Sequence, residues 1–337
     1  MKKVSVIGHF GFGRHLLNGQ TIKTCNVARA LEGKFSELDV EKYDTFGGVC
    51  ALLKMPFIAT RALRNSENVV FLLASRGVKY ALPILLFFNR KRKRKTHFIV
   101  IGGWLPSLCK KNKALLKRLG KISFIYVETL SMKRNLEELG LRNVVFLPNF
   151  KFLVPLNKDQ LVQADGFPVR LCTFSRVMKE KGIEDAIKAV VLLNKTQGFI
   201  KYSLDIFGQI EKSEIAWFNE LKKEFPPFVE YKGEVDSYKS VDVVKNYHAL
   251  LFPTYYSGEG FAGTLLDAMA AGVPAIASNW KYNPEIINGR NGVLFESRNV
   301  EELAMAIDTL NVSKEDCLAE YKKYSPDCVI DILVERM

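Results

Sequence analysis

The sequence predicts an α/β protein of two doubly wound domains, each with a parallel β-sheet. The chain has 337 residues, enough for about two domains at the usual ~100 to 200 residues each. Short apolar or β-branched runs alternate with segments of helical periodicity along most of it, as in parallel α/β proteins. A composition of 48% hydrophobic and 25% charged residues supports a large core and excludes disordered, collagen-like and coiled-coil chains.

The strands are expected where runs of Val, Ile, Leu, Phe or Tyr are bounded by polar or turn-forming residues. In the first half these runs lie at residues 4–8, 38–43, 68–73, 97–101, 123–127 and 144–147. The segment Leu147-Pro148-Asn149 ends the series, because proline and asparagine are typical of turns. In the second half they lie at residues 169–175, 202–208, 229–232, 249–253, 274–278 and 292–295.

Helices are expected between these strands, at residues 183–193, 213–224, 241–246, 264–271 and 300–310. The alternation predicts two consecutive Rossmann-like domains, residues 1–150 and 151–312, joined near residues 150–168. Ligands of such sheets bind outside the carboxyl ends of the strands. We therefore expect the two domains to face each other across a cleft that holds the functional site.

Charge is distributed unevenly between the two halves. Residues 1–150 hold 27 Lys and Arg against 9 Asp and Glu, a net charge of +18, whereas the remaining residues hold 22 against 27, a net charge of −5. Opposite signs indicate that the two domains have different partners.

The six cysteines are scattered and no two form a C-x-x-C pair, which argues against a metal or disulfide framework and favours a reducing cytoplasm. The first residues lack the pattern of a signal peptide. The longest apolar run, residues 81–88, is far shorter than the ~18 residues that cross a bilayer. We expect a soluble or peripheral protein.

The segment 252–276 carries the clearest chemical pattern. A predicted strand ends at Pro253, a glycine-rich turn presents Glu259, and a predicted helix begins near Gly263. The first N–H groups of a helix are unpaired and lie at the positive end of its dipole, so a diphosphate would be stabilised there. Asp267 lies one turn into the helix, on the face of Thr264, where a carboxylate could accept hydrogen bonds from two ribose hydroxyls.

This segment resembles the E-x7-E signature of retaining nucleotide-sugar glycosyltransferases of the GT-B fold, family 4. Residues 174–182 are similar to the family's G-R-L-x-x-x-K-G motif, and residues 204–208 and the 147–149 junction extend the resemblance. It covers residues 145–300 well and the first domain loosely. Two positions depart from the pattern, Ala262 in place of a glycine and Asp267 in place of a glutamate.

The resemblance implies roles for individual residues. Glu259 would contact the hydroxyls of the donor sugar, Asp267 would hold the ribose, and Arg176 and Lys181 would clamp the diphosphate. The residues expected to approach the sugar and phosphates are Gly260, Phe261, Ala262, Gly263, Thr264 and Gly208. Two cations at a strand-to-helix loop stabilise a departing diphosphate most in the transition state, so neither a metal nor another cofactor is expected.

A second glycine-rich loop, residues 8–13, follows the first strand. It invites a dinucleotide interpretation, but Leu16 stands where the third glycine of G-x-G-x-x-G is required. The resemblance instead implies that this loop faces the donor phosphates and the acceptor. We assign Gly19 and Lys23 to the cleft.

Two further residues are candidates for the acceptor side. One is His9, for which a structural role is the alternative. The other is Gly103, which lies where family members often carry a histidine.

Basic residues concentrate in two places of the first half. The first is the run Arg90, Lys91, Arg92, Lys93, Arg94 and Lys95, and the second is the segment 110–119, with apolar residues at helical spacing. Such segments suit an anionic membrane surface, at ~1 kcal/mol for each Lys or Arg near it. Nucleic acid is the rival partner, but no RRM, KH or zinc motif accompanies the cations, so membrane is preferred. For the second segment a plain solvated helix end stays open.

The sequence thus predicts a retaining glycosyltransferase that uses a UDP-sugar and a lipid-linked or cell-surface polysaccharide acceptor. It would act in the cytoplasm, peripherally at the inner face of the cell membrane, and would bind no nucleic acid. The resemblance implies a helical tail, residues 313–337, that packs back on the first domain. Two alternatives stay open: a nucleotide-sugar epimerase of the same architecture, and a non-catalytic protein that binds membrane or nucleic acid.

Overall fold

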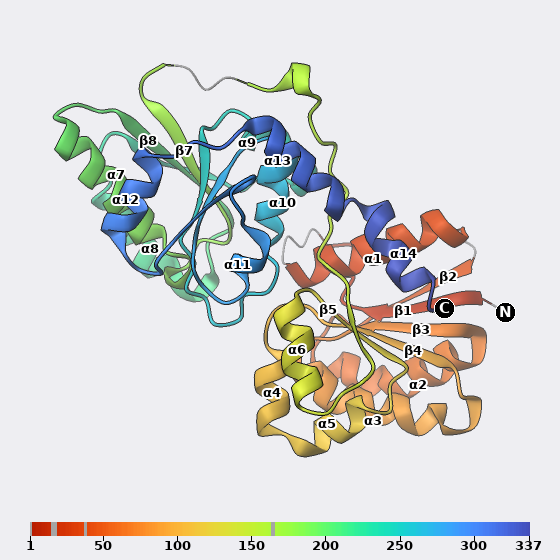
Figure 1. Cartoon of the computed structure of the whole chain (residues 1–337). Coiled ribbons are helices and arrows are strands. Elements are labelled where there is room, and N and C mark those ends of the chain that lie inside the picture. Colours follow the sequence, from red (N-terminus) through yellow and green to blue (C-terminus); the bar gives the residue numbers. More distant parts are fainter. Residues whose placement is uncertain (1, 15–18, 37–38, 163–165) are drawn as a thin grey trace. The chain divides into compact units, whose positions relative to one another are not determined.

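The computed structural model describes residues 2–14, 19–36, 39–162 and 166–337. Leu16, which entered the dinucleotide argument, and Leu38, the first residue of a predicted strand, lie outside these ranges. The chain divides into two compact units, Met1–Lys151 with Tyr324–Met337, and Phe152–Lys323. Each unit contains one six-stranded parallel sheet covered by helices (Figure 1).

The sheet of the first unit has the strand order β2-β1-β3-β4-β5-β6. Its strands are β1 (Lys2–Gly8), β2 (Val40–Asp44), β3 (Ser66–Leu72), β4 (Lys95–Ile99), β5 (Phe124–Val127) and β6 (Val144–Phe146). All six predicted strands are therefore confirmed, with shifts of up to two residues at their ends. The helices are α1 (Gly19–Phe35), α2 (Val49–Asn65), α3 (Ser75–Arg92), α4 (Leu105–Lys111), α5 (Lys113–Leu119) and α6 (Leu130–Glu138).

Crossover handedness places these helices on the two faces of the first sheet. The connection from β1 to β2 runs in the opposite direction along the sheet to the connections β2 to β3 and β3 to β4. Because such connections are right-handed, α1 lies on one face and α2 and α3 lie together on the other (Figure 1). Apolar side chains of the strands fill the space between, with Phe71 and Phe98 stacked 4.9 Å apart and both buried.

The sheet of the second unit has the order β12-β11-β10-β7-β8-β9. Its strands are β7 (Val169–Phe174), β8 (Tyr202–Phe207), β9 (Val229–Gly233), β10 (Ala249–Phe252), β11 (Ala275–Ser278) and β12 (Gly292–Phe295), so the six predicted here are also confirmed. The helices include α7 (Ile183–Gln197), α8 (Ile215–Lys223), α9 (Ser240–Val244), α10 (Gly263–Ala270), α11 (Asn283–Ile286) and α12 (Val300–Asp308). The order reverses between β7 and β10, and the carboxyl ends of these neighbouring strands are where such sheets bind ligands.

The predicted tail is divided between the two units. Helix α13 (Lys314–Tyr321) packs on α10 and belongs to the second unit, whereas α14 (Pro326–Val334) packs on α1 in the first. Helix α14 has an apolar stripe of Val329, Ile330 and Leu333, and all three are buried. Removing these side chains from water favours the packing of the helix. Within the described ranges, no helix combines the length and apolar character that a bilayer crossing requires.

Candidate functional site

The centre of the candidate site is a contact between Lys181 and Glu259. The Lys181 Nζ lies 2.5 Å from the Glu259 Oε2, and the side chains are only 12% and 8% exposed. Lys181 also lies 5.3 Å from the ring centroids of Phe252 and Tyr256. A cation is thus held between a carboxylate and two aromatic faces, in a setting where its charge is weakly screened.

The position of Lys181 follows from how its loop meets the end of β10. A short 3₁₀ turn (Lys179–Lys181) ends at Gly182, which has φ 73° and precedes α7. A Cβ at Gly182 would lie 2.1 Å from the carbonyl oxygen of Pro253, so only glycine permits this approach. The carbonyl of Glu180 accepts a hydrogen bond from the Tyr255 N–H at 2.8 Å, which fastens the two loops together.

The position of Glu259 follows from the turn after β10. The Thr254 hydroxyl donates to the Glu259 Oε2 at 2.9 Å, and the Glu259 N–H donates to the Tyr256 carbonyl at 3.2 Å. Trp280 donates its ring N–H to the same Tyr256 carbonyl at 2.9 Å. The carboxylate therefore has a fixed direction, with one of its oxygens shared by a cation and a hydroxyl.

Helix α10 begins directly after this turn. Its N-cap residue is Ala262, whose side chain cannot satisfy the first N–H groups. The Thr264 hydroxyl oxygen is enclosed and has no hydrogen-bond partner within the described part of the chain. Gly260 and Phe261 are buried, and Ala262 and Gly263 are half-buried. The start of the helix, without a side-chain cap, thus lies beside Glu259, and the positive end of the helix dipole suits an anionic oxygen.

Arg176 pairs with a different carboxylate, that of Glu211. Its guanidinium bonds the Glu211 Oε2 at 2.7 Å, and this hydrogen bond is the main cause that lowers the pKa of Glu211. Gly208 lies at the end of β8, where a Cβ would be 1.8 Å from the Ser175 carbonyl oxygen. Arg176 and Gly208 therefore lie where the loops after β7 and β8 meet. Lys181, also in the loop after β7, instead contacts the turn after β10.

Asp267 points into the interior of the second unit. It is 2% exposed, and its Oδ1 accepts a hydrogen bond from the Ser240 hydroxyl at 2.7 Å. Burial is the main cause that raises the pKa of Tyr321, and the nearby charge of Asp267 raises it further. A ribose contact of Asp267 would therefore have to compete with Ser240 for its Oδ1.

The residues predicted in the first unit lie at the carboxyl edge of its own sheet. Gly19 begins α1 and is exposed. Lys23 is buried in α1, with its Nζ 2.5 Å from the Glu128 Oε1 at the end of β5. His9 shares a 2.8 Å hydrogen bond with the Thr21 hydroxyl. Gly103 is buried in the loop between β4 and α4.

The cations of the basic run, residues 90–95, differ in their exposure and in their hydrogen-bond partners. Arg90, Lys91 and Lys93 are exposed at the end of α3, as is Arg92, which donates to the Thr60 carbonyl at 2.8 Å. The Arg94 Nε donates to the Leu63 carbonyl at 3.3 Å, and the Lys95 Nζ donates to the main-chain oxygens of Arg336 and Met337. These last two cations therefore have structural partners. The segment 110–119 forms two short helices that meet at Asn112, whose side chain accepts from the Leu115 N–H.

Four residues that contact the predicted site residues were not singled out from the sequence. Thr254 and Ser240 hold Glu259 and Asp267, and Glu211 and Glu128 pair with Arg176 and Lys23. For Glu128 and Thr254 a signal existed, because each directly follows a predicted strand, where ligand-binding side chains are expected. Ser240 had none, since its contact joins two helices 27 residues apart.

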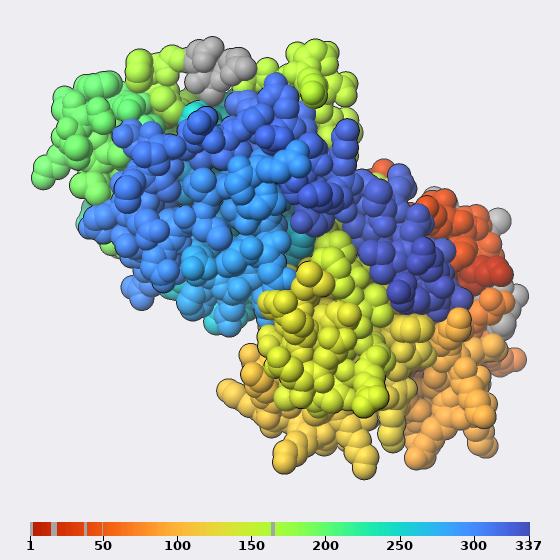
Figure 2. Space-filling model, viewed as in Figure 1, coloured from red at the N-terminus to blue at the C-terminus, as the bar shows by residue number. Residues whose placement is uncertain are grey.

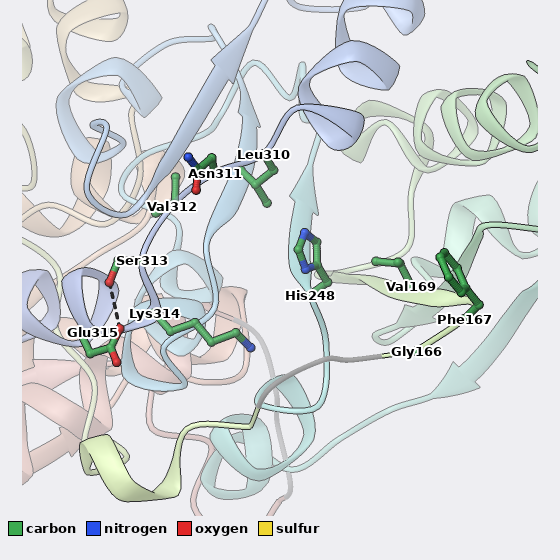
Figure 3. Close-up of a pocket in the computed structure, with 10 residues that line it drawn as sticks. All are labelled: Gly166, Phe167, Val169, His248, Leu310, Asn311, Val312, Ser313, Lys314 and Glu315. Atoms are coloured by element: carbon green, nitrogen blue, oxygen red, sulfur yellow. Dashed lines mark hydrogen bonds between the residues drawn. The ribbon is translucent and has the colours of Figure 1, made fainter. Parts of the chain in front are cut away.

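A separate cavity of about 550 Å³ opens at the other edge of the second sheet, where the strands begin (Figure 3). Val169 starts β7, His248 precedes β10, and residues 310–315 join α12 to α13. Burial first, and then Lys314, lower the pKa of His248. Because it lies at the amino ends of the strands, this cavity does not belong to the Lys181 and Glu259 site. Across the described ranges, no group of three or more His, Cys, Asp and Glu could hold a metal ion.

Part of the chain is similar in sequence to known glycosyltransferases. Residues 168–311 match the family described as glycosyl transferases group 1. An uncharacterized glycosyltransferase of Methanocaldococcus jannaschii is 32% identical over 144 residues, 41% of this chain and 35% of that protein. The amylovoran biosynthesis glycosyltransferase AmsK of Erwinia amylovora is 26% identical over 225 residues, 63% of this chain and 50% of that protein. The chain therefore spans half or less of the length of these relatives.

The fold extends beyond the matched segment. The crystal structure of Anabaena Alr3699/HepE in complex with UDP superposes with a TM-score of 0.74 at 14% identity, covering 99% of both chains. At that identity the likeness concerns the fold alone. Residues 168–311 contain Lys181, Glu259 and α10, so the family match and the candidate site fall in the same unit. The chain has the two-domain GT-B fold, and residues 168–311 of its second unit are similar to the glycosyl transferases group 1 family.

Proposed function

We propose that this protein is a retaining, metal-independent glycosyltransferase of family 4 that transfers a sugar from a UDP-sugar to an acceptor hydroxyl. The observation that carries the proposal is the Lys181 and Glu259 pair at the end of β10, next to the uncapped start of α10. The UDP in the similar Anabaena structure supports the choice of nucleotide. No observation favours an epimerase.

The proposed donor site divides the ligand among these groups. The N–H groups at the start of α10, with the Thr264 hydroxyl and Lys181, would receive the diphosphate. Glu259 would orient the sugar hydroxyls while it holds Lys181 in place. Arg176 would reach the diphosphate by leaving Glu211, an exchange between exposed partners that costs little. Asp267 would hold the ribose once Ser240 yields one of its oxygens.

The chemical step then needs no protein nucleophile. The bond between the anomeric carbon and the diphosphate oxygen breaks, and the acceptor oxygen bonds to the same face of that carbon. The acceptor proton passes to the departing phosphate oxygen, whose growing charge Lys181 and the helix start stabilise. Such preorganised donors act most strongly in the transition state.

The acceptor side is assigned to the first unit. We propose a lipid-linked or cell-surface polysaccharide acceptor, supported by the name of the Erwinia relative, and a place at the cytoplasmic face of the membrane. His9 and Gly103, with Gly19 and Lys23, lie at the carboxyl edge of the first sheet, where a ligand of that sheet would bind.

Calorimetry with UDP, and with UDP-glucose and UDP-N-acetylglucosamine, tests the donor half directly. We expect saturable binding that is unchanged by EDTA and is weakened at least tenfold in Lys181→Ala. Absence of binding by any UDP, GDP or ADP compound at millimolar concentration would contradict the proposal. NMR of the first-formed product distinguishes retention from inversion at the anomeric carbon.

A further inference from the structure

The first unit has an outer surface with one sign of charge. Between residues 49 and 121, which span α2 to α5, the chain holds seventeen Lys and Arg and a single acidic residue, Glu67. Glu67 belongs to β3, so the helices themselves carry no acidic side chain. Figure 2 shows orange atoms of this segment on the surface of the first unit. Such a surface attracts polyanions of any kind.

The same surface exposes large apolar side chains. Two come from α2 and two from α3, with exposed fractions far above those of core residues: Leu53 76%, Phe57 67%, Tyr80 61% and Phe87 63%. Leu53 and Phe57 are four residues apart, and Tyr80 and Phe87 are seven apart, so each pair lies on one side of its helix. We name these four residues, with the cations around them, the α2–α3 face.

The two helices present their stripes in the same direction. They pack against each other on one face of the first sheet, opposite α1 and α14. Arg92 at the end of α3 bonds the Thr60 carbonyl of α2, which joins them further. The buried stripes, which include Met55 and Ala59 in α2 and Leu82 and Leu85 in α3, take the sheet side. The exposed stripes therefore both look away from the sheet.

Cations are interspersed with the apolar side chains on both helices. Lys54 adjoins Leu53, Lys79 adjoins Tyr80, and Arg90 and Lys91 follow Phe87 by one turn. All four cations are exposed. Arg61 pairs with Glu41 at 3.3 Å and is left out of this set. The pattern joins electrostatic attraction with side chains able to enter a nonpolar phase.

We propose that the α2–α3 face docks on an anionic bilayer, with Leu53, Phe57 and Phe87 entering the interface between headgroups and acyl chains. This inference rests on the proposed function, because docking would bring the first unit to the proposed lipid-linked acceptor. Nucleic acid binding would use the cations and aromatic rings, but it gives no reason to expose Leu53. A bilayer accounts for both kinds of side chain.

The test is sedimentation of the full chain with vesicles of phosphatidylcholine alone, or with one quarter phosphatidylglycerol, at 50 and 500 mM NaCl. We expect binding to the mixed vesicles to exceed binding to neutral vesicles at least tenfold. Changing Lys54, Lys79, Arg90 and Lys91 to Gln together should remove most of that preference, and high salt should mimic this. The set avoids Arg94 and Lys95, which bond within the unit.

The apolar part is tested by Phe57→Ser with Phe87→Ser. We expect affinity for the mixed vesicles to fall about tenfold or more, because two aromatic side chains would no longer leave water. The matched control is Phe167→Ser in the second unit, where Phe167 is 71% exposed, and it should bind as the unchanged protein does. In Phe87→Trp, brominated lipids should quench the added fluorescence.

Three results would overturn the proposal: no preference for anionic vesicles, equal loss in the control, or tighter binding of a poly-uridine 30-mer that displaces the vesicles. Binding of UDP by calorimetry is measured on the same variants and should not change. A protein that binds UDP but not vesicles would refute the α2–α3 face alone. One that binds vesicles but no nucleotide would refute the proposed function.

Discussion

Lys181 and Glu259 lie 78 residues apart in the chain and form an ion pair of 2.5 Å that is almost wholly enclosed. The pair joins the loop after β7 to the turn after β10, the two neighbouring strands where the order of the second sheet reverses. A buried charge without its partner is costly, so each residue holds the other in place. The pair therefore both fastens the two loops together and forms the centre of the proposed donor site.

The first prediction concerns the two sides of this pair. Lys181→Ala should cost ~2 to 4 kcal/mol of transition-state stabilisation, because a preorganised cation beside the leaving diphosphate is lost. It should also lower the free energy of unfolding by ~3 to 5 kcal/mol, since Glu259 stays buried without its partner. Donor hydrolysis and thermal unfolding measure the two effects. Lys181→Met with Glu259→Gln should recover much of the stability but none of the activity.

Arg176 is expected to behave differently, because it is exposed and pairs with Glu211. Arg176→Ala should change the free energy of unfolding by less than ~1 kcal/mol, as is usual for surface ion pairs. If it clamps the diphosphate, donor turnover should still fall by ~2 to 4 kcal/mol. Glu211→Gln serves as the control, since it removes the competing partner and should preserve turnover. Activity of Arg176→Ala within threefold of the unchanged protein would remove Arg176 from the site.

A third prediction uses two glycines of similar conformation at the two ends of α7. Gly182→Ala places a Cβ 2.1 Å from the Pro253 carbonyl oxygen, so the loop that carries Lys181 must move and UDP affinity should drop at least tenfold. Gly198 has φ 76° but open space around it, so Gly198→Ala should cost only ~1 kcal/mol of stability. Equal UDP affinities in the two variants would show that the close approach is not what positions Lys181.

The fourth prediction concerns pH and the first unit. Burial first, and the nearby Lys95 second, lower the pKa of His97 to about 3, and the neutral ring bonds Tyr126 and Asn68 at 3.0 and 3.1 Å. Below the ordinary pKa of ~6.5 the unfolded chain binds a proton that the folded chain does not. The stability that His97 contributes is therefore complete above that value and declines as pH falls toward 3, by up to ~1.4 kcal/mol per pH unit.

Urea unfolding between pH 6.5 and 4.5 measures this dependence. His97→Gln should be less stable at pH 7, because the ring contacts are lost, but its stability should decline less steeply with acid. The difference between the two curves isolates His97 from carboxylates that titrate in both proteins. Parallel curves would show that protonation of His97 is not coupled to unfolding.

Much of the fold was predictable because its signals are local. Central strands such as β3 and β10 are short apolar runs, and burial on both faces of a parallel sheet requires such runs. The helices of the first half were harder to assign. Helix α3 contains Pro83 and a stretch of apolar residues, so its periodicity is weak, and α4 and α5 are separated by a single cap residue, Asn112.

The residues of the candidate site were largely predictable from the sequence, but the contacts between them were not. Glu259 was singled out by its position after a strand and Lys181 by the family motif that residues 174–182 resemble, and the structure brings the two into contact. Arg176 was grouped with them because it lies five residues before Lys181, but Glu211, on the neighbouring loop, holds its guanidinium. Asp267 was placed near the ligand by helical spacing, but Ser240 on α9 occupies one of its oxygens.

By itself the sequence determined the succession of strands and helices, the excess of positive charge in the first half and the glycine-rich turn before α10. These three features depend on residues that are neighbours along the chain, so the amino-acid sequence shows them directly. Tertiary structure alone decided which charges meet: Lys181 with Glu259, Arg176 with Glu211, Lys23 with Glu128. The physical reason is that strand order, not chain order, sets which loop ends adjoin, and a charged side chain pairs with the opposite charge that the sheet places beside it.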